Sequence, residues 1–414
     1  MKIVIVADHA SINGGQAKVA IESAKGLAGR GYHVVYFAAV GPTDSGLIEA
    51  GVETVTLDQP DVTSASSLAR FGVQWLWNAK AAQRLSDILA QCDRDDTIVH
   101  VHGWAKALSP SIGPVLRSAK LTCVFTMHEY YTACPNGGFY DYPAAHPCHL
   151  RPMSLACIRR NCDQRSYHRK LMRVGRHAIM QHTGLLDCIR HVVTISHLQR
   201  RILQPYLPAG VHYHELANPI DVPALGQKPD PARGDFVFVG RLSAEKAPML
   251  FAEAARLAGQ RAVFVGDGPQ GAELKTHYPE ASILRWKEPA EVRSLLRNAR
   301  ALVFPSVWYE GQPLTVLEAL GLGTPVIVSD ICAGCESVED GVSGRWFRSN
   351  DARSLAAALQ ELSNDTTVRR MSCAAYDLYW SNPPTLKHHL DGLCAIYEAA
   401  LGADAKALCA EVAP

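Results

Sequence analysis

Paired glycines follow the first strand-like segment of the chain. Asn13-Gly14-Gly15-Gln16 lies between the apolar run at residues 3–7 and a helical stretch. Glycines let a ligand approach the backbone closely, and a helix N-terminus offers free N–H groups to an anion. Gly14 and Gly15 therefore predict a binding loop, although an ordinary strand-to-helix turn can also carry glycines.

A second loop carries two cations. Arg241 and Lys246 follow Phe236–Val239, the first strand-like segment of the second half. A guanidinium fork and an ammonium at the carboxyl end of a parallel strand can both reach a diphosphate in the cleft beyond that edge. The alternative is a solvated turn.

A third loop supplies two carboxylates. Glu310 follows the apolar run 301–305, and Glu318 lies in the helical stretch after it, with Gly311 and Pro313 forcing a turn between them. Ionised carboxylates accept hydrogen bonds from vicinal hydroxyls, which ribose and hexoses both offer. The alternative is a helix-start glutamate favoured by the helix dipole, with a chance neighbour.

The elements that must position these loops alternate along the chain. Short β-branched runs separated by helical stretches are typical of parallel sheets covered by helices. Strands are expected near Ile3–Ala7, Val34–Ala38, Ile98–Val101, Thr122–Thr126, Val192–Ile195, Phe236–Val239, Ala262–Val265, Ile283–Leu284, Leu302–Phe304 and Val326–Val328. A Pro- and Gly-bearing linker separates the two series. We therefore expect two Rossmann-like α/β domains, residues 1–216 and 217–374, with 375–414 crossing back to the first as a C-terminal helix.

Bulk composition limits the possible classes of protein. The chain has 414 residues, 48% of them hydrophobic, and a formal net charge of +1. That length suits two domains of about 200 residues, and the neutral balance argues against a nucleic-acid coat protein. No apolar run reaches about 18 residues, and the N-terminus enters a strand-like run without a signal region. We expect a cytoplasmic protein whose twelve cysteines are mostly reduced thiols or metal ligands.

Together these motifs resemble the signature of the family-4 retaining glycosyltransferases. The matching segments, in that family's order, are Phe238-Val239-Gly240-Arg241 with Lys246, Gly266-Asp267-Gly268-Pro269, and Pro305-Ser306 with Glu310-Gly311 and Glu318-Ala319. The Gly14-Gly15 loop, His102 and Thr126-Met127-His128-Glu129 also fit, so the likeness covers almost the whole chain. It implies a GT-B fold, with the acceptor held mainly by the first domain and the nucleotide by the second.

The resemblance also implies what individual residues do. Arg241 and Lys246 would hold the donor diphosphate. Glu318 would bind the ribose, and Glu310 would contact the transferred sugar. The full set of implied catalytic and donor-binding residues is Gly14, Gly15, His128, Arg241, Lys246, Gly268, Glu310, Leu314, Thr315 and Glu318.

The implied reaction retains the anomeric configuration. Its transition state would resemble an oxocarbenium ion, and the donor's own phosphate would help to take the acceptor proton. No cofactor is required beyond the nucleotide-diphosphate sugar, because the Arg241 and Lys246 pair can replace a divalent metal. The loop Cys332–Glu336 departs from the family's Gly-Gly-x-x-Glu and receives no role.

Other functions fit part of the pattern. A nucleotide-sugar epimerase or hydrolase would share the architecture, and so would a non-catalytic nucleotide-sugar-binding protein. Gly266–Gly271 is also a literal dinucleotide fingerprint, but it follows the second strand of its half and lacks the acidic partner about 20 residues on.

The stretch from His128 to His182 contains two further clusters. Cys134, Cys148, Cys157 and Cys162 fall within a Pro-, Gly- and Tyr-rich insertion. Four thiolates could close a structural zinc site there, and buried free thiols are the alternative.

Seven cations follow the cysteines: Arg159, Arg160, Arg165, Arg169, Lys170, Arg173 and Arg176. Such a cluster suggests contact with an anionic membrane surface or a lipid-linked phosphate, which would place the protein peripherally on the inner face of a membrane. The alternative is a solvated helix face.

Overall fold

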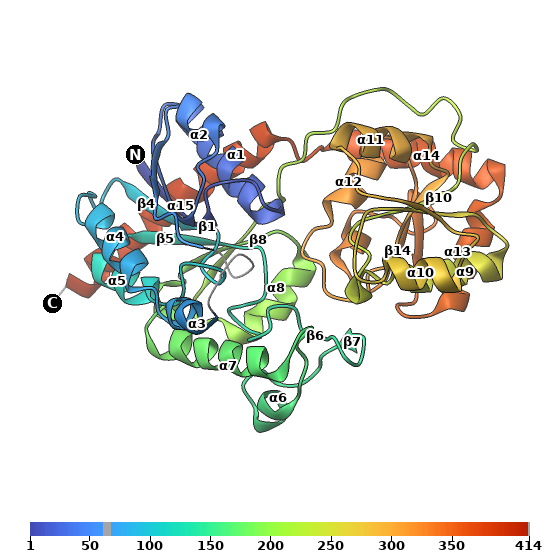
Figure 1. Ribbon diagram of the computed structural model, residues 1–414. Helices are drawn as coiled ribbons and strands as arrows, with labels where there is room; N and C mark the ends of the chain where they lie inside the picture. The colour runs from blue at the N-terminus through green and yellow to red at the C-terminus, as the bar shows by residue number, and fades with distance from the viewer. Residues whose placement is uncertain (61–67, 413–414) are drawn as a thin grey trace.

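The computed structural model describes the chain except residues 61–67 and 413–414, and it forms two α/β lobes side by side (Figure 1). The first lobe is built on a seven-stranded parallel sheet in the order β3-β2-β1-β4-β5-β8-β9. Its strands are β1 (Lys2–His9), β2 (His33–Val40), β3 (Glu53–Thr56), β4 (Thr97–Val101), β5 (Thr122–Met127), β8 (His191–Thr194) and β9 (His212–Glu215). The central strands are nearly continuous apolar runs because helices cover both faces of the sheet.

The second lobe repeats this architecture with a six-stranded parallel sheet in the order β12-β11-β10-β13-β14-β15. Its strands are β10 (Phe236–Val239), β11 (Ala262–Val265), β12 (Ser282–Leu284), β13 (Ala301–Phe304), β14 (Val326–Ser329) and β15 (Gly344–Phe347). The ten strands expected from the sequence are all present. The short edge strands β3, β9 and β15 are additional, because their mixed polar sequences carry little apolar periodicity.

Helices connect the strands of both lobes. Those of the first lobe are α1 (Gly15–Gly29), α2 (Ser45–Glu49), α3 (Leu68–Leu76), α4 (Ala79–Leu89), α5 (Ile112–Ala119) and α8 (His197–Leu203). Those of the second are α9 (Pro248–Ala258), α10 (Gly271–His277), α11 (Pro289–Asn298), α12 (Leu314–Gly321), α13 (Ala352–Leu362) and α14 (Asp365–Ser381).

The strand order determines where ligands can bind. The order reverses between β1 and β4 in the first sheet and between β10 and β13 in the second. Open parallel sheets bind ligands in the crevice at such a reversal, beyond the carboxyl ends of the strands. Three predicted binding loops follow β1, β10 and β13, so all three lie beside these crevices.

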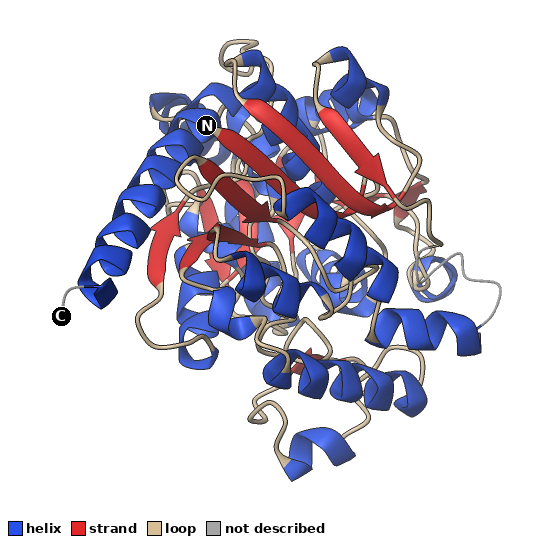
Figure 2. Ribbon diagram, turned by 90° about the vertical axis from the view of Figure 1, so that its left-hand side faces the viewer, coloured by secondary structure: helices blue, strands red, loops and turns tan. Residues whose placement is uncertain are grey.

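The last helix, α15 (Leu386–Val412), returns to the first lobe and lies along it near the N-terminus (Figure 2). Leu393 and Tyr397 are buried there with Ile3 and Ile5 of β1. The sequence predicted that the return would begin at residue 375. Ala375–Ser381 instead belong to α14, which is packed within the second lobe, so the return begins after Ser381.

An insertion follows β5 and projects from the first lobe towards the second (Figure 1). It contains the antiparallel hairpin of β6 (Tyr140–Asp141) and β7 (His146–Pro147), then α6 (Leu155–Arg159) and α7 (Tyr167–His182).

Candidate active site between the two domains

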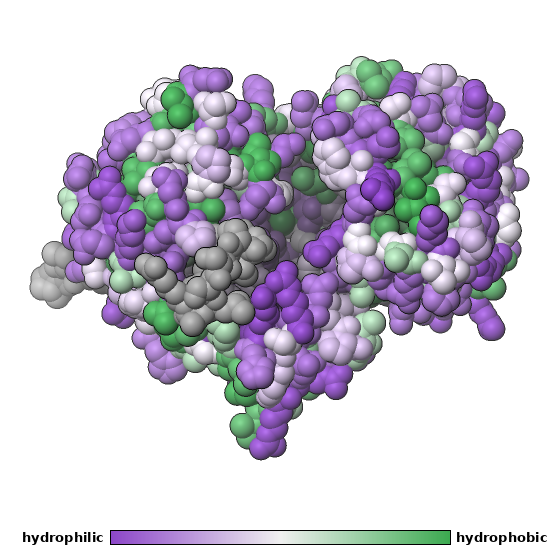
Figure 3. Space-filling view, in the orientation of Figure 1, coloured by the Kyte–Doolittle hydropathy of each residue, from purple (hydrophilic) through white to green (hydrophobic). Residues whose placement is uncertain are grey.

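A cavity of about 260 Å³ lies between the two domains, and the surface is visibly hollowed there (Figure 3). Its walls include Gly14, Gly15 and His128 from the first domain and Glu310 and Leu314 from the second. The structure therefore brings five of the predicted site residues together at one cavity.

Glu310 is the most constrained residue of this cavity. It is only 8% exposed, and its Oε1 atom accepts hydrogen bonds from Ser306 Oγ at 2.8 Å and Trp308 Nε1 at 2.7 Å. The ammonium of Lys246 forms an ion pair with the same oxygen. Three donors on one carboxylate oxygen hold the Glu310 side chain in one orientation.

Lys246 reaches Glu310 from a different loop. It ends the 3₁₀ turn Ala244–Lys246 that follows β10, whereas Glu310 follows β13. The Lys246 ammonium also lies 5.4 Å from the centre of the Phe304 ring and 5.9 Å from that of Trp308. The aromatic faces attract the cation and keep it at the edge of the cleft.

Five predicted site residues lie outside the lining of this cavity: Arg241, Lys246, Gly268, Thr315 and Glu318. Arg241 is exposed, and Glu318 is partly buried in α12. Burial raises the pKa of the Glu318 carboxylate, while Arg293 and Lys18 oppose the shift. Lys18 belongs to α1 of the first domain.

Gly268 has a packing reason to be glycine. A Cβ atom at this position would lie 2.3 Å from the carbonyl oxygen of Leu242, in the neighbouring loop. Only glycine lets these two strand-end loops approach so closely.

The wall formed by the first domain depends on Asp8, which the sequence analysis missed. This buried carboxylate accepts hydrogen bonds from the backbone N–H groups of Lys106 at 3.1 Å, Ala107 at 2.7 Å and Leu108 at 3.0 Å. It thereby orients the loop that places Lys106 at the cavity. The detectable signal was an acidic residue directly at the carboxyl end of β1.

His128 lies beside a second histidine. Its Nε2 atom is 3.1 Å from His102 Nδ1, and burial lowers the pKa of His128 to about 3. His128 is therefore neutral near pH 7 and meets a ligand as an uncharged hydrogen-bonding group. Next to it, Lys106 and Glu129 form an ion pair at 2.9 Å.

The loop without a predicted role joins the two domains. The Glu336 carboxylate accepts hydrogen bonds from the N–H groups of His197 at 3.0 Å and Leu198 at 2.6 Å, at the start of α8. In the same loop Cys332 and Cys335 are free thiols. Glu336 therefore caps a helix of the opposite domain.

Two sequence families match most of this chain. Residues 13–222 match the family described as Glycosyltransferase Family 4, and residues 233–365 match the one described as Glycosyl transferases group 1. The chain belongs to the family-4 glycosyltransferases.

Curated relatives of this family-4 glycosyltransferase match it in part. It is 33% identical over 183 residues to the UDP-Gal:alpha-D-GlcNAc-diphosphoundecaprenol alpha-1,3-galactosyltransferase of Escherichia coli, covering 40% of this chain and 46% of the relative. It is 34% identical over 132 residues to the putative teichuronic acid biosynthesis glycosyltransferase TuaC of Bacillus subtilis, covering 31% and 33% of the two chains. The chain thus spans less than half the length of both relatives.

Solved structures match over nearly the full length. Anabaena HepE, in complex with UDP and glucose, superposes with a TM-score of 0.65 and 14% identity over 96% of this chain and all of that one. Sucrose-phosphate synthase from Thermosynechococcus elongatus gives a TM-score of 0.68 and 18% identity over 97% and 99% of the two chains. These matches confirm the predicted GT-B fold.

The cysteine cluster of this glycosyltransferase surrounds a lysine. Lys170 is fully buried, and its Nζ atom lies 3.6 Å from Cys157 Sγ. Burial lowers the pKa of Lys170, but the neighbouring thiols of Cys162, Cys157 and Cys134 raise it, and the net shift is upward. The thiols of the cluster therefore surround the charged ammonium group of Lys170.

The zinc site predicted at Cys134, Cys148, Cys157 and Cys162 needs correction. The Lys170 ammonium contacts one of these thiols. Across the described part of the chain, no three His, Cys, Asp or Glu side chains are arranged to hold a metal ion. The four cysteines are free thiols, as in the alternative interpretation.

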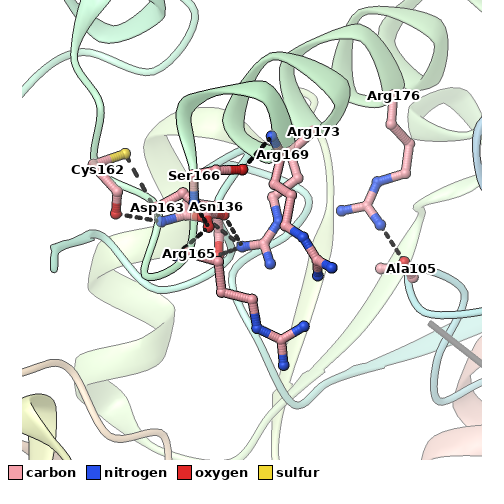
Figure 4. A network of polar contacts seen from close by, with 9 residues as sticks. All are labelled: Ala105, Asn136, Cys162, Asp163, Arg165, Ser166, Arg169, Arg173 and Arg176. Carbon is pink, nitrogen blue, oxygen red and sulfur yellow. Dashed lines mark hydrogen bonds and ion pairs between the residues drawn. The ribbon is translucent and has the colours of Figure 1, made fainter. Parts of the chain in front are cut away.

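Part of the basic segment after the cysteines makes internal contacts (Figure 4). Arg173 forms an ion pair with Asp163 at 3.3 Å and donates to Asn136. Lys170 and Arg176 are buried. Three of the seven cations therefore make internal contacts, whereas Arg159, Arg160 and Arg165 are exposed.

Arg176 supports the loop that precedes the cavity wall. Its guanidinium donates to the carbonyl of Ala105 and lies 4.1 Å from the ring centre of Trp75 and 4.9 Å from that of Tyr131. Aromatic faces compensate partly for the lost hydration of a buried cation. Arg176 therefore anchors the residue that precedes Lys106 in the cavity wall.

Proposed function

We propose that this protein transfers a sugar from a nucleoside-diphosphate sugar to a lipid-linked or glycan acceptor, with retention of the anomeric configuration. This proposal rests mainly on the ion pair between Lys246 and Glu310. The pair lies beside a cavity whose opposite wall contains Gly14, Gly15 and His128. In the proposed complex, the Lys246 ammonium would contact the donor diphosphate and the Glu310 carboxylate would contact the sugar attached to it.

The proposed donor site divides its contacts between charge and hydroxyl recognition. Arg241 is exposed in the loop after β10, and Lys246 pairs with Glu310 at the cavity, so we assign both to binding the diphosphate and stabilising the negative charge of the leaving group. The diphosphate competes with Glu310 for the Lys246 ammonium. Glu310 is then available to the sugar, and Glu318 to the ribose hydroxyls.

The relatives favour sugar transfer over the alternative functions. Their names describe glycosyltransferases, and the Escherichia coli and Campylobacter jejuni enzymes act on diphosphoundecaprenol-linked sugars. We therefore propose a lipid-linked sugar as the acceptor class and a UDP-sugar as the first donor to test. Epimerisation or hydrolysis of the donor without transfer would be the contrary outcome.

A product assay tests this proposal. The purified protein is incubated with UDP-sugars and a sugar linked to undecaprenyl diphosphate, and the product is analysed by mass spectrometry and NMR. We expect a longer lipid-linked glycan whose new linkage keeps the anomeric configuration of the donor. An inverted linkage would exclude the retaining mechanism, and free or isomerised sugar alone would exclude transfer.

We also propose that the tip of α6 contacts an anionic membrane. Leu155 is 71% exposed there and Leu150 is 37% exposed, while Arg151 and Arg159 are exposed beside them. This tip projects from the lower end of the first lobe (Figures 1 and 3). Apolar side chains flanked by cations suit an interface with acidic lipids. None of the described helices is long and apolar enough to cross a membrane.

A further inference from the structure

The β6–β7 hairpin of the insertion is packed into the core of the other domain. Tyr140 is 1% exposed, and the remaining buried members of its apolar cluster lie between residues 236 and 371. A Cβ atom on Gly138 would lie 3.0 Å from the Trp308 ring. The hairpin thus contacts the loop that carries Glu310.

The hairpin is held by contacts with the rest of the insertion. Asp141 forms an ion pair with Arg160 and accepts a hydrogen bond from Ala144 N at 3.2 Å. The N–H of Tyr142 donates to the Cys162 carbonyl at 3.4 Å. These contacts join the hairpin to the cysteine-bearing part of the insertion.

Two buried polar atoms lack partners at this contact. The hydroxyl of Tyr140 and the Oε2 atom of Glu245 each form no hydrogen bond, and Glu245 is only 7% exposed. After burial, Glu245 is the strongest influence that raises the pKa of Tyr140. One is a donor and the other an acceptor, and unpaired buried groups of this kind are costly.

Glu245 connects both loops of the proposed donor site. It directly precedes Lys246, and its backbone carbonyl accepts a hydrogen bond from Val307 N at 2.9 Å. Its Oε1 atom accepts from Ser243 Oγ at 2.7 Å. Any group that binds Oε2 therefore acts on the Lys246 turn and on the Glu310 loop together.

We propose that Tyr140 is a positioning residue for the donor. When the domains close on a nucleoside-diphosphate sugar, the Tyr140 hydroxyl donates to Glu245 Oε2 and fixes the turn that presents Lys246. The acceptor domain thereby stabilises the donor site of its neighbour. This inference rests on the proposed function, because the bond forms in the donor-bound state.

A double-mutant cycle tests the contact. Tyr140→Phe removes the hydroxyl alone, and we expect the KM for the donor and the Kd for UDP to rise about tenfold, with kcat changed less than about twofold. Glu245→Gln should weaken donor binding similarly. Adding Tyr140→Phe to the Glu245→Gln protein should then cost little more, since the pair is already weakened.

Thermal unfolding separates positioning from a structural role. Without nucleotide the Tyr140 hydroxyl is unpaired, so Tyr140→Phe should keep or raise the Tm of the free protein, while the Tm increase caused by UDP becomes smaller. Tyr376→Phe is the control, because Tyr376 is a partly buried tyrosine of α14 that packs on Trp380.

Four outcomes would overturn the positioning role of Tyr140. Three of them are a lowered Tm of the free Tyr140→Phe protein, fully additive losses in the cycle, or an equal loss in Tyr376→Phe. Sugar transfer by the wild type with unchanged donor KM in Tyr140→Phe would overturn the positioning role alone. A wild type that binds no nucleotide would overturn the proposed function as well.

Discussion

The ammonium of Lys246 and the Oε1 atom of Glu310 form an ion pair that links the loops after β10 and β13. In the ligand-free protein each charge therefore satisfies the other at the edge of the cleft. Binding of a diphosphate must replace one partner of Lys246 with another, and this exchange leads to distinct expectations for the charged residues around it.

Replacing the two glutamates should affect different steps. Glu310→Gln keeps size but removes the charge that would face the sugar, so kcat should fall by about 10²-fold or more. UDP affinity should be retained or increased, because the charge that competes for Lys246 is gone. Glu318→Gln should mainly raise the donor KM and weaken UDP binding, because ribose contacts are similar in ground and transition states. Titration with UDP followed by turnover assays distinguishes them. Loss of UDP binding in Glu310→Gln with normal binding in Glu318→Gln would reverse the two roles.

Lys246 and Arg241 should contribute to the affinity for UDP. Lys246→Ala and Arg241→Ala should each weaken UDP and donor binding by about 1.5–3 kcal/mol, as expected for a lost charge-assisted contact. Isothermal titration measures the change directly. Lys275, exposed on α10, provides the control variant Lys275→Ala, which should bind UDP normally. Normal UDP affinity in both cleft variants would refute a diphosphate site here.

Lys170 should be replaceable by a residue of similar shape. Its buried ammonium contacts thiols, and no carboxylate forms an ion pair with it among the described residues. Lys170→Met removes the desolvation penalty and keeps most of the packing, so the free energy of unfolding should stay equal or increase. Lys170→Ala leaves a cavity and should cost about 2–4 kcal/mol. Urea unfolding of both variants checks this, and a strongly destabilised Lys170→Met protein would contradict it.

Stability should fall as the pH decreases below about 6.5. Burial lowers the pKa of His100 to about 3, so this histidine stays neutral in the folded protein while it becomes protonated in the unfolded chain. Its contribution is complete above the unfolded pKa and is lost towards pH 3, at about 1.4 kcal/mol per pH unit. Urea midpoints between pH 7.5 and 5.5 should therefore fall less steeply in His100→Asn than in the wild type. An unchanged slope would disagree with a buried neutral histidine.

Membrane contact should depend on the α6 tip rather than on the inner cations. Replacing Leu155 and Arg159 with Ser and Gln should reduce co-sedimentation with vesicles that contain acidic phospholipid, and salt should reduce it for the wild type. Lys275→Gln is a control that removes an exposed charge from the other domain. Binding that is independent of lipid charge, or retained by the α6 variant, would exclude this surface.

Local sequence was sufficient for the strand-end loops. Gly14 after β1, Lys246 after β10 and Glu310 after β13 each follow their own strand directly. In a parallel sheet the carboxyl ends of all strands lie at one edge, so the position of each loop follows from the contiguous strand–loop–helix pattern. The GT-B fold and the placement of these three residues could therefore be predicted.

Long-range packing decided the rest. Lysine and arginine usually lie at the surface, but Lys170 is buried beside a thiol of the insertion, and Arg176 is buried against aromatic rings that include the distant Trp75. Asp8 orients a loop about 100 residues away, and Tyr140 enters the core of the other domain. The sequence by itself determined the family, the two sheets and the strand-end loops, because these depend on contiguous patterns. Only the tertiary structure decided which charged side chains are buried and which residues form contacts between the domains. Burial and ion pairing depend on neighbours in space that no local sequence pattern specifies.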